Sequence, residues 1–215
     1  MYLLKILSYI GLLVLFINTI LYFVGFAGKS KAYKSLVIYL MSLFVIQTVA
    51  DVYATYGMNN HFLATYLLFI PFILLSYFFY NLLRNINSKK AKIIKYVSPV
   101  VMLGLLIQYS VTPSLYYVFN SIGLLATTCI IITYSVLYLY EIISRPLPFH
   151  YVTIGILIYY LSSSLIFISV PTIASFNVEI SLLIWKINAV LFTAYQLLIL
   201  WEWKQAFYQK RIRQD

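Results

Sequence analysis

Seven long apolar stretches, each closed by charged, Pro, Asn or Ser residues, constrain the fold of this chain more than any other feature. A helix needs about 20 predominantly apolar residues to cross the hydrocarbon core of a bilayer. The apolar runs are continuous and do not alternate with a period of two, which favours helices over barrel strands. We expect spans at residues 5–26, 35–56, 62–83, 93–109, 115–142, 151–170 and 180–203. The predicted fold class is therefore an all-α membrane protein, a single bundle of seven transmembrane helices.

The composition excludes the main classes of soluble protein. Of the 215 residues, 63% are hydrophobic and only 9% are charged, whereas soluble domains carry about 25% charged residues. So few polar side chains cannot coat a water-soluble particle, which excludes disordered linkers and ordinary cytosolic enzymes. The single cysteine, Cys129, cannot form a disulfide within the chain.

Two of the expected spans are atypical. The first has an apolar stretch of about 19 residues, longer than the 7–15 of a signal peptide, and three lysines follow it. We therefore expect a membrane helix there and no cleaved leader. The fourth span is the weakest, because it has about 17 residues and contains Pro99, so it is expected to be short, kinked or tilted.

The distribution of Lys and Arg predicts the orientation in the membrane. If the N-terminus faces outside, 13 of the 15 basic residues lie in inner links and in a short basic C-terminal tail at residues 204–215. Positive residues are retained on the cytoplasmic side, which favours an N-out, C-in protein of the cytoplasmic (inner) membrane. The topology accounts for the net charge of +10. We expect attraction to anionic lipids at the cytoplasmic face and no binding of nucleic acid.

Ionisable residues inside a membrane are the default candidates for function. Asp51 and Lys186 are the two that fall within spans, both in the outer third of the bilayer. Glu179 lies seven residues before Lys186, and so on the same helix face. These residues predict an outward-opening polar pocket in which Asp51 and Lys186 form an ion pair. Further candidate ligand-binding residues at middle or outer depth are Gln47, Asn120 and Asn188.

A purely structural role for the two charged residues is the other interpretation. Lys186 follows Trp185, a residue typical of the interfacial belt, so its side chain can reach water or Glu179. Asp51 lies about five residues from the expected end of its helix. Both residues would then set the depth and register of their helices. The sequence leaves the two interpretations open.

Patterns that carry enzymatic chemistry are not found in the sequence. His61 and His150 lie in links on opposite sides of the membrane, so they cannot share a metal ion, and the five carboxylates are also divided between the two faces. The sequence contains no G-x-S-x-G, P-loop or H-E-x-x-H motif. A Ser–Lys dyad that includes Lys186 is chemically feasible, but the sequence does not indicate which serine would take part. We expect no enzyme activity, no metal site and no cofactor.

In size and topology the chain resembles the compact seven-helix modules of bacterial sensor proteins, along all seven spans. The resemblance implies a role in signalling and assigns no site residues. We expect a sensory or accessory subunit that binds a small or lipidic ligand, or a partner helix, in the outer half of the bundle. The expected cytoplasmic segments are too short for an output domain, so a separate cytoplasmic or membrane protein would receive the signal. The alternative is a small-solute transporter or channel with Asp51, Gln47 and Lys186 in its path.

Overall fold

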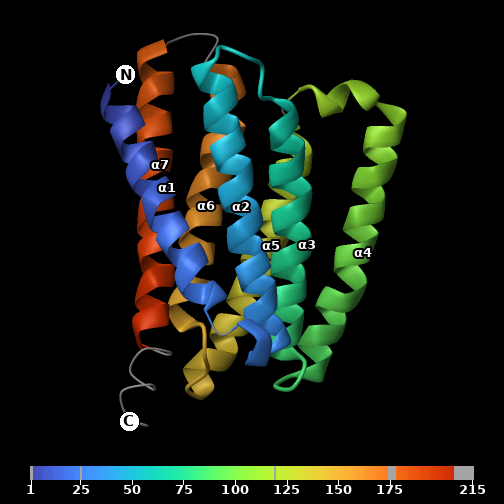
Figure 1. The fold of residues 1–215 in the computed structure, drawn as a ribbon. Coiled ribbons are helices and arrows are strands. Elements are labelled where there is room, and N and C mark those ends of the chain that lie inside the picture. The colour runs from blue at the N-terminus through green and yellow to red at the C-terminus, as the bar shows by residue number, and fades with distance from the viewer. Residues whose placement is uncertain (1, 25, 119, 174–177, 206–215) are drawn as a thin grey trace. The chain divides into compact units, whose positions relative to one another are not determined.

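The computed structural model describes residues 2–24, 26–118, 120–173 and 178–205, which form α-helices and two short 3-10 helices joined by brief links (Figure 1). The α-helices in the described residues are α1 (Tyr2–Phe23), α2 (Lys31–Thr55), α3 (Phe62–Leu83), α4 (Ser88–Val111), α5 (Ser121–Ser144), α6 (His150–Ile173) and α7 (Val178–Trp203). The 3-10 helices are η1 (Phe26–Gly28) and η2 (Pro113–Tyr116). The all-α prediction is confirmed for this part of the chain.

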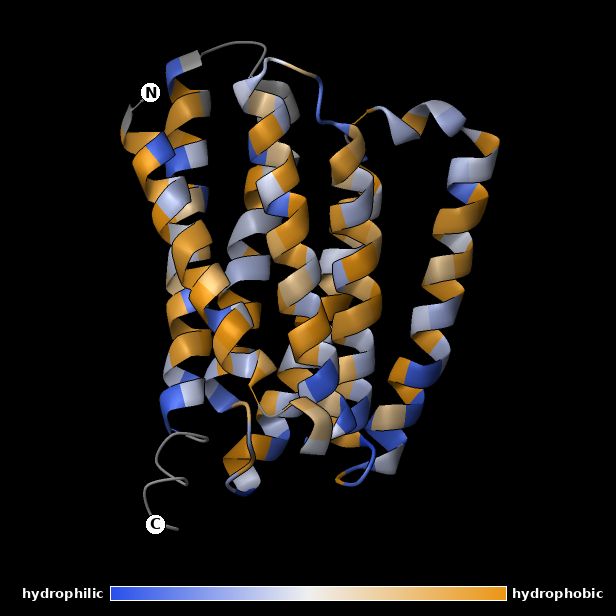
Figure 2. Ribbon diagram, viewed as in Figure 1, coloured by the Kyte–Doolittle hydropathy of each residue, from blue (hydrophilic) through white to orange (hydrophobic). Residues whose placement is uncertain are grey.

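Six of these helices are long and apolar enough to cross a membrane, namely α1 to α5 and α7. Hydrophobic residues cover most of the length of these helices (Figure 2). In α6, the residues that can be assessed for a span are His150–Ile166, which form a shorter apolar stretch. The six helices indicate a multi-pass membrane protein. The seventh span and the orientation stay predictions.

The starts of two helices, α4 and α5, differ most from the sequence-based expectation. The fourth helix is longer than expected at both ends. It begins at Ser88, where the Asn87 side chain caps it by accepting a hydrogen bond from the Lys90 amide at 3.2 Å, and it continues past Pro99 to Val111. The fifth begins at Ser121, six residues later than expected. There the segment Pro113–Tyr116 forms η2, and the Asn120 side chain accepts a hydrogen bond from the Gly123 amide at 2.9 Å. Polar capping residues, which hydropathy does not register, determine both starts.

The chain divides into two compact units, which we describe separately. Unit 1 comprises Met1–Val24 and Ser135–Asp215, and it contains α1, the second part of α5, α6 and α7. Unit 2 is the continuous segment Gly25–Tyr134, with α2, α3, α4 and the first part of α5. The single-domain organisation expected from the sequence stays a prediction.

In unit 1, α7 packs against both α1 and α6. Gly11 permits the close approach of α1 to α7, since a Cβ atom at this position would lie 2.9 Å from Phe192 Cδ1 and from Thr193 Oγ1. On the other side of α7, the rings of Tyr159 and Tyr195 stack with their centroids 5.2 Å apart. Small and flat side chains thus hold the three helices together.

In unit 2, α3 packs against both α2 and α4, but the three helices are not equally buried. Half of the most apolar window of α3 is buried, whereas only 17% of the α4 window is. The Ser35 hydroxyl donates to the Leu74 carbonyl at 2.6 Å and ties α2 to α3. The core of unit 2 therefore lies around α3, and α4 is its most loosely packed long helix.

Candidate functional site

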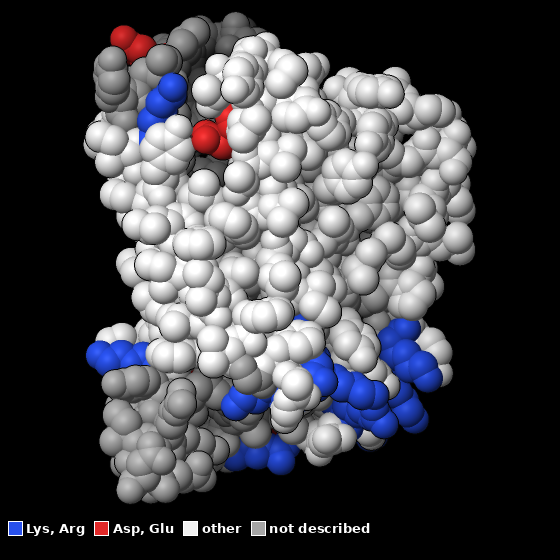
Figure 3. All heavy atoms as spheres, in the orientation of Figure 1, with Lys and Arg blue, Asp and Glu red and all other residues white. Residues whose placement is uncertain are grey.

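Basic side chains gather at one end of unit 2. Both α2 and α4 begin at this end and α3 ends there, and Figure 3 shows Lys and Arg collected where α4 begins. Asp51, the only acidic residue of the segment 25–134, lies four residues before the other end of α2. The basic end therefore has a strongly positive potential that attracts anions. Its eight residues are Lys29, Lys31, Lys34, Arg84, Lys89, Lys90, Lys92 and Lys95.

A cleft of about 550 Å³ lies between α3 and α4 near this basic end. From α3 it is lined by Phe72, Ile73, Ser76, Tyr77 and Tyr80. From α4 it is lined by Ile94, Lys95, Ser98, Pro99 and Met102. The low burial of α4 described above agrees with such an opening beside it.

The lining of the cleft changes from polar to apolar along its length. Ser76 lies seven residues before the end of α3, and Lys95 lies seven residues after the start of α4, so the two are at similar distances from the link between the helices. Met102 lies a further seven residues along α4, about 10.5 Å at 1.5 Å per residue. Phe72 and Ile73 of α3 also lie farther from the link than Ser76. The cleft is amphiphilic, with its polar part nearer the basic end.

Two polar groups in the lining of the cleft, the Ser76 hydroxyl and the Lys95 ammonium, are available to bind a ligand. Ser76 is only 4% exposed, and its Oγ has no hydrogen-bond partner among the described residues. A buried hydroxyl without a partner is unfavourable. The Lys95 ammonium lies 5.9 Å from the ring centroid of Tyr96, a contact that is weak at exposed positions. By contrast, the Ser98 hydroxyl is already hydrogen-bonded to the Tyr134 hydroxyl at 2.9 Å.

Three of the predicted site residues belong to unit 2. Asp51 is exposed on α2, and Gln47 is half-buried one turn earlier. Asn120 is buried, and its amide group is engaged at both atoms: Nδ2 donates to the Gln108 side chain at 3.1 Å, and Oδ1 caps α5. The geometry of Asn120 is that of a helix cap joined to α4.

The other three predicted residues belong to unit 1, on α7. Glu179 is exposed and Lys186 is half-buried. The Asn188 side-chain oxygen is buried and has no hydrogen-bond partner among the described residues. Because Asp51 and Lys186 belong to different units, their ion pair stays a prediction, as does a transport path that contains both.

An aromatic group lies around η2, which follows the end of α4 remote from the basic residues. The Tyr66 and Tyr116 hydroxyls are 2.8 Å apart, and Phe62 lies beside both rings. This hydrogen bond raises the pKa of Tyr116 above its ordinary value. Aromatic residues with a hydroxyl at one end are typical of the membrane–water interface. The group supports an interface at this end of unit 2.

Sequence reasoning did not identify the interaction of Glu202 with α6. Glu202 lies in the last turn of α7 and is buried, and its two carboxylate oxygens accept hydrogen bonds from the Phe149 amide at 2.8 Å and the Tyr151 amide at 2.7 Å. These amides are at the N-terminus of α6, where a helix has unsatisfied donors. Phe149 has a φ of 62°, which a non-glycine residue rarely adopts. Glu202 therefore holds the link before α6 in a strained conformation.

A second polar contact in unit 1 joins α1 to α7. Asn18 is fully buried, and its Nδ2 donates to the Gln196 carbonyl at 2.8 Å and to the Gln196 side chain at 3.1 Å. One turn farther along, the Tyr22 hydroxyl donates to the Ile199 carbonyl at 2.9 Å. Interhelical hydrogen bonds of this kind stabilise helix pairs in membranes. Asn18 therefore helps to hold α1 against α7.

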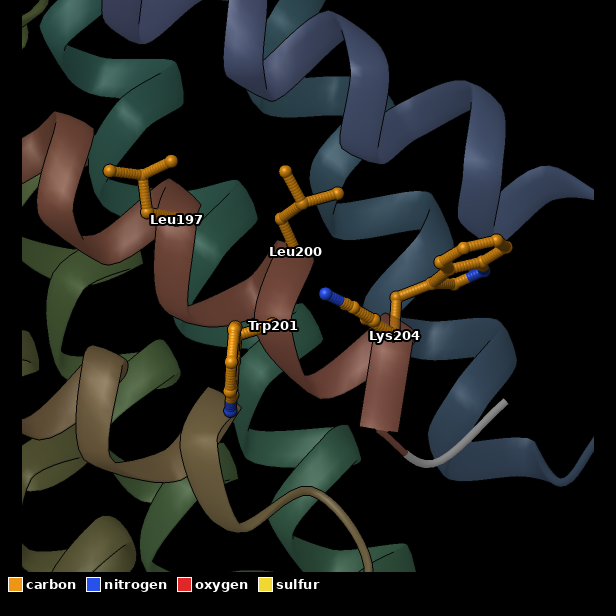
Figure 4. A pocket seen from close by; sticks show the side chains of 5 residues that line it. Leu197, Leu200, Trp201 and Lys204 are labelled. Atoms are coloured by element: carbon orange, nitrogen blue, oxygen red, sulfur yellow. The ribbon is translucent and has the colours of Figure 1, made fainter. Parts of the chain in front are cut away.

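A smaller hollow of about 490 Å³ lies along the end of α7 (Figure 4). Its lining comes from the last turns of α7 and the residue that follows, and consists of Leu197, Leu200, Trp201, Trp203 and Lys204. The Lys204 ammonium lies 5.3 Å from the Trp201 ring, as is common for residues at a membrane surface. This hollow has no unpartnered buried polar group among the described residues, so the α3–α4 cleft is the stronger candidate for ligand binding.

Comparisons with protein-family models, with curated proteins and with solved structures give no match. Among the described residues, no group of three or more His, Cys, Asp or Glu is placed to hold a metal ion. The functional interpretation therefore depends on the cleft and the charges around it.

Proposed function

We propose that this multi-pass membrane protein is a sensory or accessory subunit that binds a lipidic ligand in the cleft between α3 and α4. The observation that carries this proposal is the amphiphilic lining of the cleft, with Ser76 and Lys95 toward one end and Met102 toward the other. An amphiphile has the same order of polar and apolar parts. This site lies toward the basic end of unit 2, whereas the sequence-based hypothesis located it in the outer half of the bundle.

The packing of α4 supports a route by which the bound state is passed on. Because α3 is well buried and α4 is not, an occupant of the cleft displaces α4 at a smaller energetic cost than α3. The first two turns of α4 carry Lys89, Lys90, Lys92 and Lys95. A ligand that binds more tightly to one position of α4 than to another shifts α4 toward that position. The four lysines then move with the helix. We propose that a separate protein partner reads this change.

The topology that we propose has seven spans, with the N-terminus outside and the basic end of unit 2 in the cytoplasm. The clustering of the eight basic residues at one end of unit 2 supports this orientation, since positive residues are retained on the cytoplasmic side. In this topology the cleft faces the inner leaflet of the cytoplasmic membrane.

Native mass spectrometry of the gently extracted full chain tests whether the cleft binds lipid. The substitution Met102→Trp fills the apolar part of the cleft, and Leu103→Trp is the matched control, because Leu103 is 59% exposed and does not line the cleft. We expect Met102→Trp to lose a retained lipid that the wild type and Leu103→Trp both keep. Equal retention by the three proteins would contradict the proposal. A host protein that co-purifies with the wild type, and less with Met102→Trp, would identify the partner.

A further inference from the structure

We infer that the occupant of the cleft is an anionic phospholipid from the leaflet at the basic end of unit 2, with its phosphate at Lys95 and one acyl chain extending toward Met102. This inference rests on the proposed function and names its ligand. It is carried by three observations: the charge at the mouth of the cleft, the unpartnered hydroxyl in its wall, and its exposure to the membrane.

The charge around the cleft selects an anion. Lys95 is the only charged residue in the lining, and seven more basic residues lie at the same end of unit 2. The only acidic residue of the segment, Asp51, lies near the opposite end of α2. A phosphate is a stronger partner for the Lys95 ammonium than the face of Tyr96, which it contacts at 5.9 Å. An anionic headgroup places no further positive charge in this region, whereas the headgroup of phosphatidylcholine carries a cation.

The buried hydroxyl of Ser76 selects a ligand with acceptor oxygens near the phosphate. Ser76 and Lys95 lie at similar distances from the link between α3 and α4, on opposite helices. Ser76 Oγ has no partner among the described residues, so an acceptor inside the cleft would satisfy it. In a glycerophospholipid the ester carbonyls lie next to the phosphate. We assign one ester carbonyl to Ser76 and the phosphate to Lys95.

The exposure of the cleft indicates that the ligand comes from the bilayer and not from water. Ile73 and Tyr77, which line the cleft on α3, are 45% and 46% exposed on a helix that is apolar enough to span the membrane. An acyl chain can therefore enter sideways from the surrounding lipid. From Lys95 to Met102 the lining extends about 10.5 Å along α4, so it covers the first part of a chain and leaves the remainder in the bilayer.

Photo-crosslinking of the full chain in lipid nanodiscs tests the inference. The probes are phosphatidylglycerol and phosphatidylcholine with the same diazirine-bearing acyl chain. We expect phosphatidylglycerol to label the peptides that contain Phe72 and Met102 about fivefold more strongly than phosphatidylcholine, as one lysine–anion contact at a membrane surface allows. The substitution Lys95→Gln should remove this preference. The matched control Lys92→Gln, an exposed lysine of the same helix outside the lining, should keep it.

A third substitution, Ser76→Ala, tests the contact with the ester carbonyl. It should weaken labelling by both lipids alike, because both carry ester carbonyls, and it should leave the preference for phosphatidylglycerol unchanged. A change in the preference itself would contradict the assignment of Ser76 to the ester group.

The outcomes separate failure of the inference from failure of the proposed function. Equal labelling of the cleft peptides by the two lipids, unchanged in Lys95→Gln, would overturn the anionic ligand while leaving a lipid-binding cleft. Labelling of neither peptide by either probe would overturn both. Loss of labelling on addition of glycerol phosphate would identify a soluble phosphate compound as the ligand and would overturn the bilayer as its source.

Discussion

Replacement of Glu202 by glutamine tests whether its carboxylate holds the start of α6 in place. The two carboxylate oxygens accept hydrogen bonds from the Phe149 and Tyr151 amides at 2.8 and 2.7 Å, and Glu202 is only 4% exposed. A carboxamide has one acceptor oxygen, so in Glu202→Gln its NH₂ group faces one of the two amide donors. Each buried donor left without a partner costs about 1–3 kcal/mol. We therefore expect a loss of about 1–3 kcal/mol in Glu202→Gln and about 2–6 kcal/mol in Glu202→Ala.

The measurement is the free energy of unfolding of the full chain in mixed micelles titrated with SDS, followed by tryptophan fluorescence. Glu141→Gln is the matched control, because Glu141 pairs with Arg145 at 3.4 Å across one helical turn and the arginine side chain is 46% exposed. Such a pair contributes less than about 1 kcal/mol. Equal effects of Glu202→Gln and Glu141→Gln would refute the role of the two backbone hydrogen bonds. A more stable Glu202→Gln would show that the desolvation of the carboxylate outweighs them.

Three further predictions follow from the packing and the charge distribution. Gly11→Ala should destabilise unit 1 by about 1–3 kcal/mol through contact with α7. Gly104→Ala should leave stability unchanged or raise it, because the added Cβ meets nothing within 4 Å beyond the backbone around it in its own helix; the same SDS titration measures both. Asn18→Leu should cost about 1 kcal/mol in that assay, because the hydrogen bonds to Gln196 are lost while the unpartnered Asn18 oxygen is also removed, and an unchanged free energy would contradict a stabilising role for these bonds. Alkaline phosphatase fused after residue 112, which lies in an outer link of the N-out topology, should be active, and the same enzyme fused after residue 86, in an inner link, should be inactive. The reverse pattern would refute this topology.

Much of the fold could be predicted from hydropathy because the bilayer sets the length of each apolar helix. The third span was expected at residues 62–83, and α3 has these bounds, since polar residues flank it on both sides. Where caps determine the boundary, hydropathy was less accurate. Asn87 and Asn120 start α4 and α5 at places that an average over apolar residues does not detect.

The cleft was not predictable because its existence depends on how closely two helices pack. Lys95, Ser98 and Met102 are spaced at three and four residues and so share a face of α4, which is the signal that the sequence does contain. Whether α3 fills the space opposite that face depends on the side chains of both helices. In the same way, Glu202 accepts hydrogen bonds from residues more than 50 positions away, and nothing local indicates those partners.

The division into units has a consequence for the synthesis of the protein. Unit 2 is one continuous segment of chain, so its helices can associate as soon as they have entered the membrane. Unit 1 is interrupted, and Asn18 meets Gln196 only after a further 178 residues. At translation rates of about 5–20 residues per second, this takes about 10–35 s. During that time Asn18 of α1 has not yet met Gln196, and a polar side chain without a partner is unfavourable in a bilayer. We therefore expect α1 to stay near the site of insertion until α7 arrives.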